Sequence, residues 1–327
     1  MRQIPMERCF KFLILLCGLA MSGVLSAQVA GRPVRIIAGS AAGGIADLLA
    51  RPIAEAMSKS LGAPVIVDDR PGAAGLVAVN ELLRSPADGN TILQLSATVS
   101  VLNQFLFSKL PYDPEKDIVP VSITAGVPML MVVNPSVQAR TIEEFVAAAK
   151  AAPGKLTYGH GGLGAPAHMA FERLRGVAGI DVVPVAYKSG PFAVQDLLGG
   201  RIDAMIEGIS LVENHIKDGR LRLLAVTDSK RHPAFPDVPT ATERAYPGYV
   251  TDIWIGMGVR SGTPPAAVTR LNAEINAAMS SALVKETYAK LRFDVRPSLA
   301  PKEFADFIAA ERKIWGPVIR NANVKLD

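Results

Sequence analysis

Cysteine is nearly absent from this chain of 327 residues, which contains only Cys9 and Cys17. No cysteine follows residue 17, so the rest of the chain cannot form a disulfide, a thiolate metal site or a cysteine nucleophile. Without disulfides, the fold must be stabilised by its hydrophobic core. The hydrophobic share is 49%, and about 300 residues after the N-terminal segment are enough for two domains.

The chain also lacks a strong excess of one charge and any cluster of histidines. Its 35 lysines and arginines and 30 acidic residues give a formal net charge of +5, and no basic cluster is interleaved with aromatic residues. The four histidines form no H-x-x-x-H pair and have no acidic partner at ligand spacing; they are His160, His168, His215 and His232. We therefore expect neither a nucleic-acid partner nor a metal site.

Long hydrophobic runs are missing except near the N-terminus. Residues 12–24 form an almost uncharged apolar run that follows three basic residues and precedes Leu25-Ser26-Ala27. This order is typical of a secretory signal peptide, and a run of about 13 residues is shorter than the ~20 needed for a membrane-spanning helix. We expect residues 1–27 to be a signal peptide and the mature, soluble protein to be in the periplasm.

Two runs rich in β-branched residues end in glycine-rich corners, and a helical pattern follows each corner. Gly39–Gly44 follows the predicted strand Val34–Ala38, and Gly159–Gly164 follows the predicted strand Leu156–Tyr158. Glycines at such a corner let the backbone approach a ligand, and the helix N-terminus offers unpaired N–H groups to an anion. Neither corner contains arginine or lysine. We therefore expect an anionic ligand to be bound without an arginine clamp.

The order of predicted elements repeats in residues 34–95 and 156–206. In both parts a strand, a glycine corner, a helix, a second strand, a loop, a second helix and a turn lead to a third strand. This alternation is typical of parallel α/β layers, and its repetition predicts two similar lobes. The chain is expected to pass between the lobes near Pro128 and Pro135 and within residues 233–247.

The second corner also satisfies the G-x-G-x-x-G pattern of dinucleotide-binding folds, with Asp181 17 residues after the last glycine. This leaves open a nucleotide-dependent oxidoreductase that uses residues 159–164. Pro166 in the first helical turn, the export signal and the mid-chain position disfavour that alternative. An esterase is disfavoured because no serine has the G-x-S-x-G spacing. A corner that serves only tight packing is another alternative.

Asp47 and Asp203 are the acidic residues nearest the expected cleft. Asp47 lies in the first turn of its predicted helix, where a carboxylate stabilises the helix dipole. Asp203 is a candidate to receive an amine or to organise the adjacent loop. Nothing pairs the two carboxylates for acid–base catalysis. The sequence therefore predicts a binding protein rather than an enzyme.

Seven short motifs, in order along the chain, resemble those of the substrate-binding proteins of tripartite tricarboxylate transporters, the Bug family. They are Pro111–Asp117, Val133–Ser136, Pro153–Leu156, Leu197–Gly200, Leu224–Thr227, Pro236–Thr240 and Leu271–Ile275. The resemblance implies a two-lobed periplasmic-binding-protein type II fold of the α/β class, each lobe a mainly parallel sheet flanked by helices. It also implies a discontinuous first lobe of residues 28–130 and 254–327, a second lobe of residues 131–253, and a ligand cleft between them.

The resemblance further implies a monomer without a cofactor that captures a small organic carboxylate and delivers it to membrane permease subunits. A sensory role of the same fold stays open. In this family the ligand is held by backbone amides of the glycine corners, short hydroxyl side chains and bound waters. Carried over, the expected ligand-binding positions are Ser40, Ala42, Gly43, Gly44, Asp47, Ala73, Ala74, Ser96, His160, Gly161, Gly164, Ala165, His168, Tyr187 and Asp203.

Two departures from the family pattern bear on the ligand. His160 and Ala165-Pro166 stand where relatives usually have small or hydroxyl residues, and Ser40-Ala41-Ala42 replaces an aromatic residue and prolines. The loss of a hydroxyl at Ala165 removes a hydrogen bond worth about 0.5–1.5 kcal/mol. An imidazole at His160 could stack on a ring. We therefore expect an aromatic or otherwise bulky carboxylate rather than a small dicarboxylate.

Overall fold

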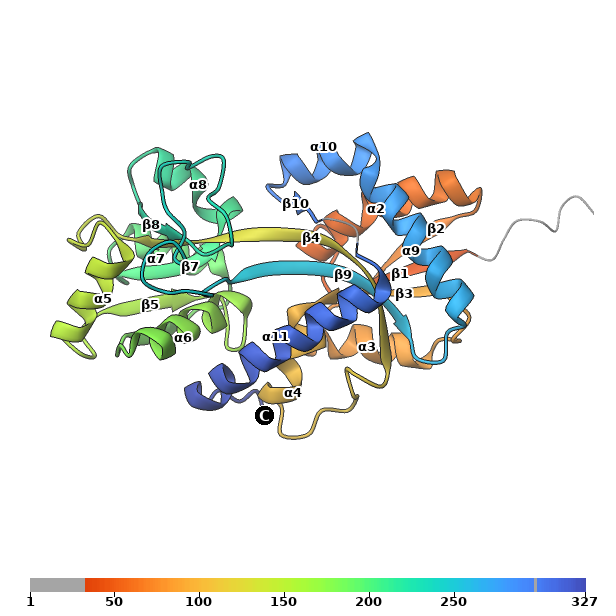
Figure 1. Ribbon diagram of the computed structural model, residues 1–327, viewed down its shortest axis with the longest axis horizontal. Helices are drawn as coiled ribbons and strands as arrows, with labels where there is room; N and C mark the ends of the chain where they lie inside the picture. The colour runs from red at the N-terminus through yellow and green to blue at the C-terminus, as the bar shows by residue number, and fades with distance from the viewer. Residues whose placement is uncertain (1–32, 297–298) are drawn as a thin grey trace, which may run out of the picture.

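A computed structural model describes residues 33–296 and 299–327. The expected signal peptide, residues 1–27, lies outside the described residues. Figure 1 shows two groups of helices and strands side by side, joined by the long strands β4 (Ile118–Val133) and β9 (Asp252–Arg260). No helix among the described residues is long and apolar enough to cross a membrane. The molecule is two-lobed, as the sequence predicts.

The first lobe contains a parallel unit of three strands with two connecting helices. β1 pairs in parallel with β2 and β3, so that Ile36 lies opposite Val67 and Ile92. The helices of the C-terminal part complete this lobe. Its elements, besides the long strands, are β1 (Val34–Ala38), α2 (Ile45–Leu61), β2 (Val65–Asp69), the 3-10 turn η2 (Ala73–Gly75), α3 (Leu76–Arg84), β3 (Thr91–Ser96), the π-helical turn η3 (Thr98–Leu102), α4 (Asn103–Leu106), α9 (Pro265–Ser280), α10 (Ala282–Lys290), β10 (Asp294–Val295) and α11 (Pro301–Ala322).

The second lobe repeats the same unit. β5 pairs in parallel with β6 and β7, with Tyr158 opposite Pro184 and Ala204. The order strand, corner, helix, strand, loop, helix, strand is the one that the sequence predicts. The elements are α5 (Ile142–Ala151), β5 (Thr157–His160), α6 (Pro166–Ala178), β6 (Val183–Ala186), α7 (Gly190–Leu198), β7 (Ala204–Gly208), α8 (Ile209–Lys217) and β8 (Arg222–Val226).

The strands form one continuous, mixed sheet in the order β2-β1-β3-β9-β4-β7-β5-β6, with β8 and β10 paired to β4 outside this path. β4 changes partners along its length: Ile118–Pro128 pairs with β9, and Met129–Val133 pairs with β7. All pairings of β4 and β9 are antiparallel. Each lobe therefore adds antiparallel strands to its parallel unit.

Residues 233–247 stay in the second lobe, so the expected crossing there is wrong. Thr240 forms a β-bridge with Val226 in this lobe. The chain returns to the first lobe through β9, whose residues Asp252 and Ile255 lie opposite Pro128 and Ala125. Two adjacent strands thus carry the chain between the lobes, because paired strands satisfy the backbone hydrogen bonds of a buried crossing.

Hydrophobic cores lie on both sides of the sheet. α2 buries Leu49, Ile53 and Met57 at near-helical spacing, which is why this sequence folds as a helix against the sheet. On the other side, α11 buries Phe304 and Trp315. α11 belongs to the first lobe but also packs against α6 of the second. This helix is therefore a further link between the lobes, and in Figure 1 it runs from the first lobe towards α6.

Candidate functional site

The first glycine corner lies at the carboxyl ends of the parallel strands of the first lobe. Beside it is a pocket of about 250 Å³ between the N-terminus of α2, the turn η2 and the end of β3. Ala74 and Ser96, two of the expected ligand-binding residues, line this pocket. Its other walls are Gly39, Ala46, Gly75, Ala78, Leu93, Gln94, Leu95, Thr98, Val99 and Ile255.

Asp47 holds the first corner in shape rather than facing solvent. Its buried carboxylate accepts a hydrogen bond from the amide of Gly43 at 2.7 Å and pairs with Arg51 at 2.6 Å. The Asp47 amide in turn donates to Ser40 Oγ at 3.2 Å. Burial raises the pKa of Asp47, but the Arg51 pair and the Gly43 amide outweigh it, so the pKa is lowered. Asp47 and Ser40 thus fix the loop, while the Ala42 and Gly43 backbone remains exposed.

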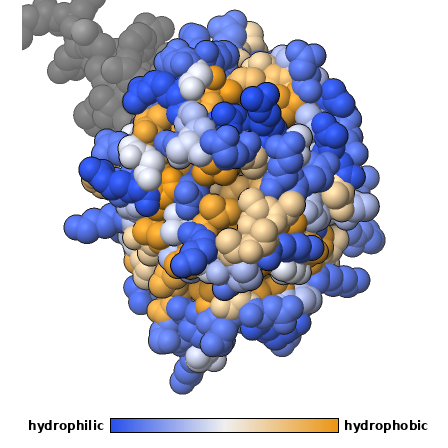
Figure 2. Space-filling model, turned by 90° about the vertical axis from the view of Figure 1, so that its left-hand side faces the viewer, coloured by the Kyte–Doolittle hydropathy of each residue, from blue (hydrophilic) through white to orange (hydrophobic). Residues whose placement is uncertain are grey.

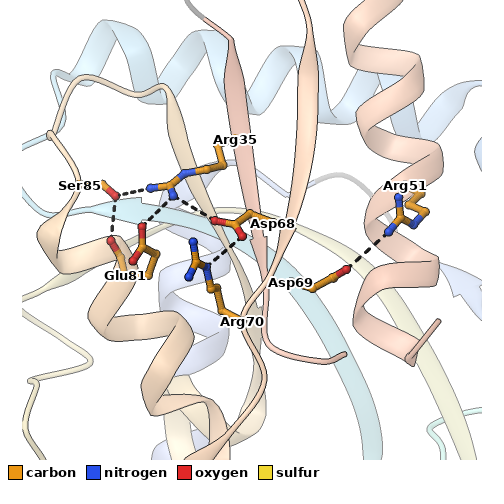
Figure 3. Close-up of polar contacts among 7 residues, drawn as sticks. All are labelled: Arg35, Arg51, Asp68, Asp69, Arg70, Glu81 and Ser85. Carbon is orange, nitrogen blue, oxygen red and sulfur yellow. Dashed lines mark hydrogen bonds and ion pairs between the residues drawn. The ribbon is translucent and has the colours of Figure 1, made fainter. Parts of the chain in front are cut away.

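The arginines close to this corner are already paired with carboxylates of the chain (Figure 3). Arg51 also contacts Asp69 at 3.5 Å. Arg35 contacts Asp68 at 3.0 Å and Glu81 at 2.7 Å, which ties β1 to β2 and α3. Arg70 and Ser85 belong to the same network of contacts, Arg70 through Asp68 and Ser85 through Arg35. These guanidinium groups are thus already paired with carboxylates of the lobe.

The turn η2 brings a strained backbone to the pocket. Ala73 and Ala74 have φ values of 46° and 52°, in the left-handed region that favours glycine. The carbonyl of Ala74 accepts a hydrogen bond from Asn103 Nδ2 at 3.0 Å, which holds the turn in place. Such strain is retained where surrounding structure over-determines it, as at many binding sites.

The second corner rests on a stack of buried rings. His160 and His168 lie with ring centroids 4.0 Å apart, and Tyr158 stacks on Phe171 at 4.0 Å. The amide of Gly164 donates to His168 Nδ1 at 3.0 Å, and His160 Nδ1 lies 2.9 Å from the carbonyl oxygen of Gly162. Both imidazoles are fully or almost fully buried. They support the corner from beneath, and neither presents a ring face to solvent.

The environment of the stack keeps the histidines neutral. Burial, with small contributions from His160 and Arg175, lowers the pKa of His168 to about 3. Burial also lowers the pKa of His160, partly opposed by the Gly162 carbonyl and Glu172. Glu172 accepts hydrogen bonds from the Tyr158 hydroxyl and from Arg175. Both shifts favour the neutral imidazole, so neither ring supplies a positive charge at the corner.

The second corner packs closely on the start of α7. A Cβ placed on Gly161 would lie 2.4 Å from the backbone nitrogen of Gly190, so only glycine fits there. Tyr187 follows β6 at this edge, and its hydroxyl donates to Asp196 at 2.8 Å. Burial and Asp196 raise the pKa of Tyr187 to about 12. The N-cap residues of α2, α6 and α7 are Gly44, Ala165 and Ser189; none caps its helix through a side-chain hydrogen bond.

The sequence profile described as "Tripartite tricarboxylate transporter family receptor" matches residues 49–324. This chain belongs to that family. The Bug-family resemblance is thereby confirmed, and the chain is a receptor rather than an enzyme. The nucleotide-dependent oxidoreductase has no support from the family match.

Relatives and solved structures extend the match over most of the chain. Protein BugT of Bordetella pertussis (strain Tohama I) is 37% identical over 299 residues, 90% of either chain. The structure of R. palustris Rpa4515 with adipate has a TM-score of 0.76 at 29% identity and covers 91% of this chain and 99% of that one. The structure of MatC from Rhodopseudomonas palustris with bound malate has a TM-score of 0.73 at 28% identity and covers 88% of this chain and 99% of that one. The two-lobed fold of this receptor is therefore shared with periplasmic binding proteins.

One expected ligand-binding residue of this tripartite tricarboxylate receptor lies elsewhere. Asp203 precedes β7 and accepts hydrogen bonds from the amide and hydroxyl of Thr157, at 2.8 and 2.9 Å. Thr157 begins β5, whereas the corner follows the end of β5 at His160. Asp203 therefore lies at the opposite edge of the parallel unit, and the expectation that it borders the cleft is wrong.

Two buried polar residues of this receptor that no sequence motif singles out lie within strands of the two parallel units, Gln94 in β3 and Glu207 in β7. Gln94 in β3 lines the pocket of the first lobe, is 6% exposed, and has no hydrogen-bond partner for either amide atom among the described residues. Glu207 near the end of β7 is 7% exposed. A polar residue inside an otherwise apolar strand was the available signal, because burying an unpaired polar group is costly.

Proposed function

We propose that this receptor captures a small organic carboxylate between its two lobes in the periplasm and delivers it to the permease subunits of a tripartite transporter. The observation that carries the proposal is the pair of helix-opening corners, one in each lobe, at the carboxyl ends of β1 and β5. Structures of related proteins with adipate and malate support a carboxylate as the ligand. Residues 1–27 act as the export signal, and the mature receptor works as a monomer.

The carboxylate is bound by backbone N–H groups and short side chains rather than by arginine. Helix N-termini provide a partial positive charge that favours an anion. The arginines nearest the first corner are paired within the chain, which supports this assignment. The proposed contacts are Ser40, Ala42, Gly43, Gly44, Ala73, Ala74, Gln94, Ser96, Gly161, Gly164, Ala165 and Tyr187; Asp47, His160 and His168 shape the two corners behind them.

The lobes are residues 28–130 with 254–327 and residues 131–253. The change of partners between Pro128 and Met129 in β4 supports this division. Ligand binding closes the lobes because a contact set split between them is complete only in the closed form.

We still expect a ligand with an apolar body, but the argument now comes from exposed hydrophobic residues rather than from stacking on His160. The His160 ring is buried and offers no stacking surface. Exposed hydrophobic residues lie in the first turns of the helices at the corners, namely Ile45 and Leu48 in α2 and Phe192 in α7. On the end of the second lobe, hydrophobic surface lies in small groups between hydrophilic residues (Figure 2). An aliphatic chain or an aromatic ring would bury part of the exposed apolar area near the corners.

The test is a thermal-shift screen followed by calorimetry with adipate, malate, succinate and benzoate. At least one acid should raise the unfolding temperature and bind with saturation. The corresponding neutral amide should do neither. His160→Ser should leave the order of affinities unchanged, because the ring does not touch the ligand. It should still lower the unfolding free energy by about 1–3 kcal/mol, since it leaves a cavity in the ring stack. Binding of the neutral amides as tightly as the acids would contradict the proposal.

A further inference from the structure

Glu207 occupies an unusual position for an acidic residue in a receptor for anions. It is the penultimate residue of β7, at the carboxyl end of the parallel unit, and only 7% of it is exposed. Its Oε1 accepts a hydrogen bond from the following amide, Gly208 N, at 2.9 Å. Its Oε2 has no hydrogen-bond partner in the part of the chain that the structure describes, yet it is not among the unpartnered atoms sealed from solvent.

The free oxygen of Glu207 points to the start of α7. A Cβ placed on Gly190, the first residue of α7, would lie 2.9 Å from Glu207 Oε2. Gly190 is also the residue on which Gly161 of the second corner packs. The first amides of a helix lack intrahelical partners, and the N-cap residue Ser189 adds no side-chain bond here. The carboxyl group therefore lies where the corner and the helix N-terminus meet.

Within residues 33–296 and 299–327, no element beside Glu207 forms an ion pair with it. Leu130 of β4 lies opposite Glu207 in the sheet. The side chain of Leu211 in α8 lies beside Gly190, as the Glu207 carboxyl group does. On α8, Glu213 is paired with Lys217 and Arg292. On α7, Asp196 is paired with Arg201 and the Tyr187 hydroxyl. The histidines of the ring stack pack on the opposite face of the sheet, with α6.

Lys188 is a further charged residue near α7. It is exposed in the loop before α7, and no ion pair or charge interaction joins it to Glu207. Burial raises the pKa of Glu207 to about 7, although the Gly208 amide opposes the shift. The carboxyl group is therefore protonated for much of the time at neutral pH, and a nearby anion would favour that form further.

We propose that Glu207 is a ligand-contacting residue that takes up one proton from solvent when the carboxylate binds and donates it in an O–H···O⁻ hydrogen bond. The proposal rests on the proposed function. It names Glu207 as the residue of the second lobe whose protonation makes binding of the anion depend on pH. An ionised Glu207 would repel the ligand, whereas the protonated group replaces one of the donors that an arginine would otherwise supply. The expected consequence is that affinity falls as pH rises.

The experiment is titration calorimetry of the purified receptor with adipate and malate between about pH 6 and pH 8.5, in two buffers of different ionisation enthalpy. One proton should be taken up per ligand at the upper end of this range, and the dissociation constant should rise by about tenfold per pH unit above the pKa of Glu207. Glu207→Gln keeps a hydrogen-bond donor and should make affinity independent of pH. Asp181→Asn is the matched control, since it removes the same charge from an exposed side chain of this lobe, and it should behave as the original chain does.

The outcomes separate this inference from the proposed function. Binding of either acid without proton uptake, or an unchanged pH dependence in Glu207→Gln, would overturn the role of Glu207 and leave carboxylate binding intact. If neither these acids nor the others of the screen bind, the proposed function fails and this inference fails with it. If Glu207→Gln does not fold, the proton uptake measured with the original chain in the two buffers still tests the role of Glu207.

Discussion

At the scale of single residues, the receptor keeps polar groups in its interior that the described part of the chain does not satisfy. Among the described residues, Gln94 of β3 has two such atoms, and Glu207 near the end of β7 has one oxygen without a hydrogen-bond partner that solvent still reaches. A buried polar atom without a partner costs about 1–3 kcal/mol, so the fold alone does not favour these residues. A ligand or its bound water is the partner that would offset this cost.

Gln94→Leu tests that view. Leucine has a similar volume and removes both unpaired atoms, so the free energy of unfolding should rise by about 1–3 kcal/mol, as measured by urea denaturation. Affinity for the bound acid should fall, as measured by calorimetry. The control is Gln104→Leu, which removes a hydrogen bond to the Val101 carbonyl and should lower stability by about 1 kcal/mol. A Gln94→Leu variant that is less stable and binds normally would show a purely structural role.

At the scale of elements, the second corner depends on the close approach of β5 to the start of α7. Gly161 and Gly190 lie backbone to backbone there, and Gly164 packs on Leu106 and Leu326 of the first lobe. These contacts bring the amides at the N-termini of α6 and α7 to one edge. The glycines are thus needed for packing as well as for ligand access.

Gly161→Ala should damage the second corner. The added methyl group would meet the Gly190 backbone at 2.4 Å, and the resulting overpacking should cost about 1–3 kcal/mol and weaken ligand binding. Gly176→Ala is the matched control, because nothing lies within 4 Å of its added Cβ in the interior of α6. It should raise stability by about 0.5–1 kcal/mol. Thermal denaturation of the two variants gives the comparison, and equal stabilities would contradict it.

At the scale of the whole molecule, the described strands β4 and β9 and the helix α11 connect the lobes. β4 and β9 pass between them as neighbours, and α11 packs against α6. Arg173 of α6 lies 5.7 Å from the Trp315 ring of α11 and donates to the carbonyls of Gly248 and Val250. Relative motion of the lobes therefore requires bending of β4 and β9 and rearrangement at this arginine.

Ligand-induced closure should be visible in solution. Small-angle scattering should show a smaller radius of gyration with an acid that calorimetry has shown to bind, and no change with its neutral amide. Thermal stability should rise with ligand concentration, by about 2.7 kcal/mol at a hundredfold excess over the dissociation constant. An unchanged radius of gyration with a saturating ligand would show that the lobes do not close.

Local patterns in the sequence determined much of this protein. The strand Val34–Ala38, both corners, the helices behind them and the repeated order of elements follow from β-branched runs, glycines and helical spacing, which act over a few residues. The family motifs then implied the two lobes. These features could be predicted because each depends on neighbours in the chain.

Only the tertiary structure decided the rest. β4 extends from Ile118 to Val133 because Pro120 and Ser122 are held in a strand by β9, a partner more than a hundred residues away. The tertiary structure also decided that the imidazole of His160 packs beneath the second corner and that Asp203 lies at the opposite end of the parallel unit. A strand sequence does not reveal which face will be covered by a helix, and that covering fixes whether a polar side chain meets the ligand or the core.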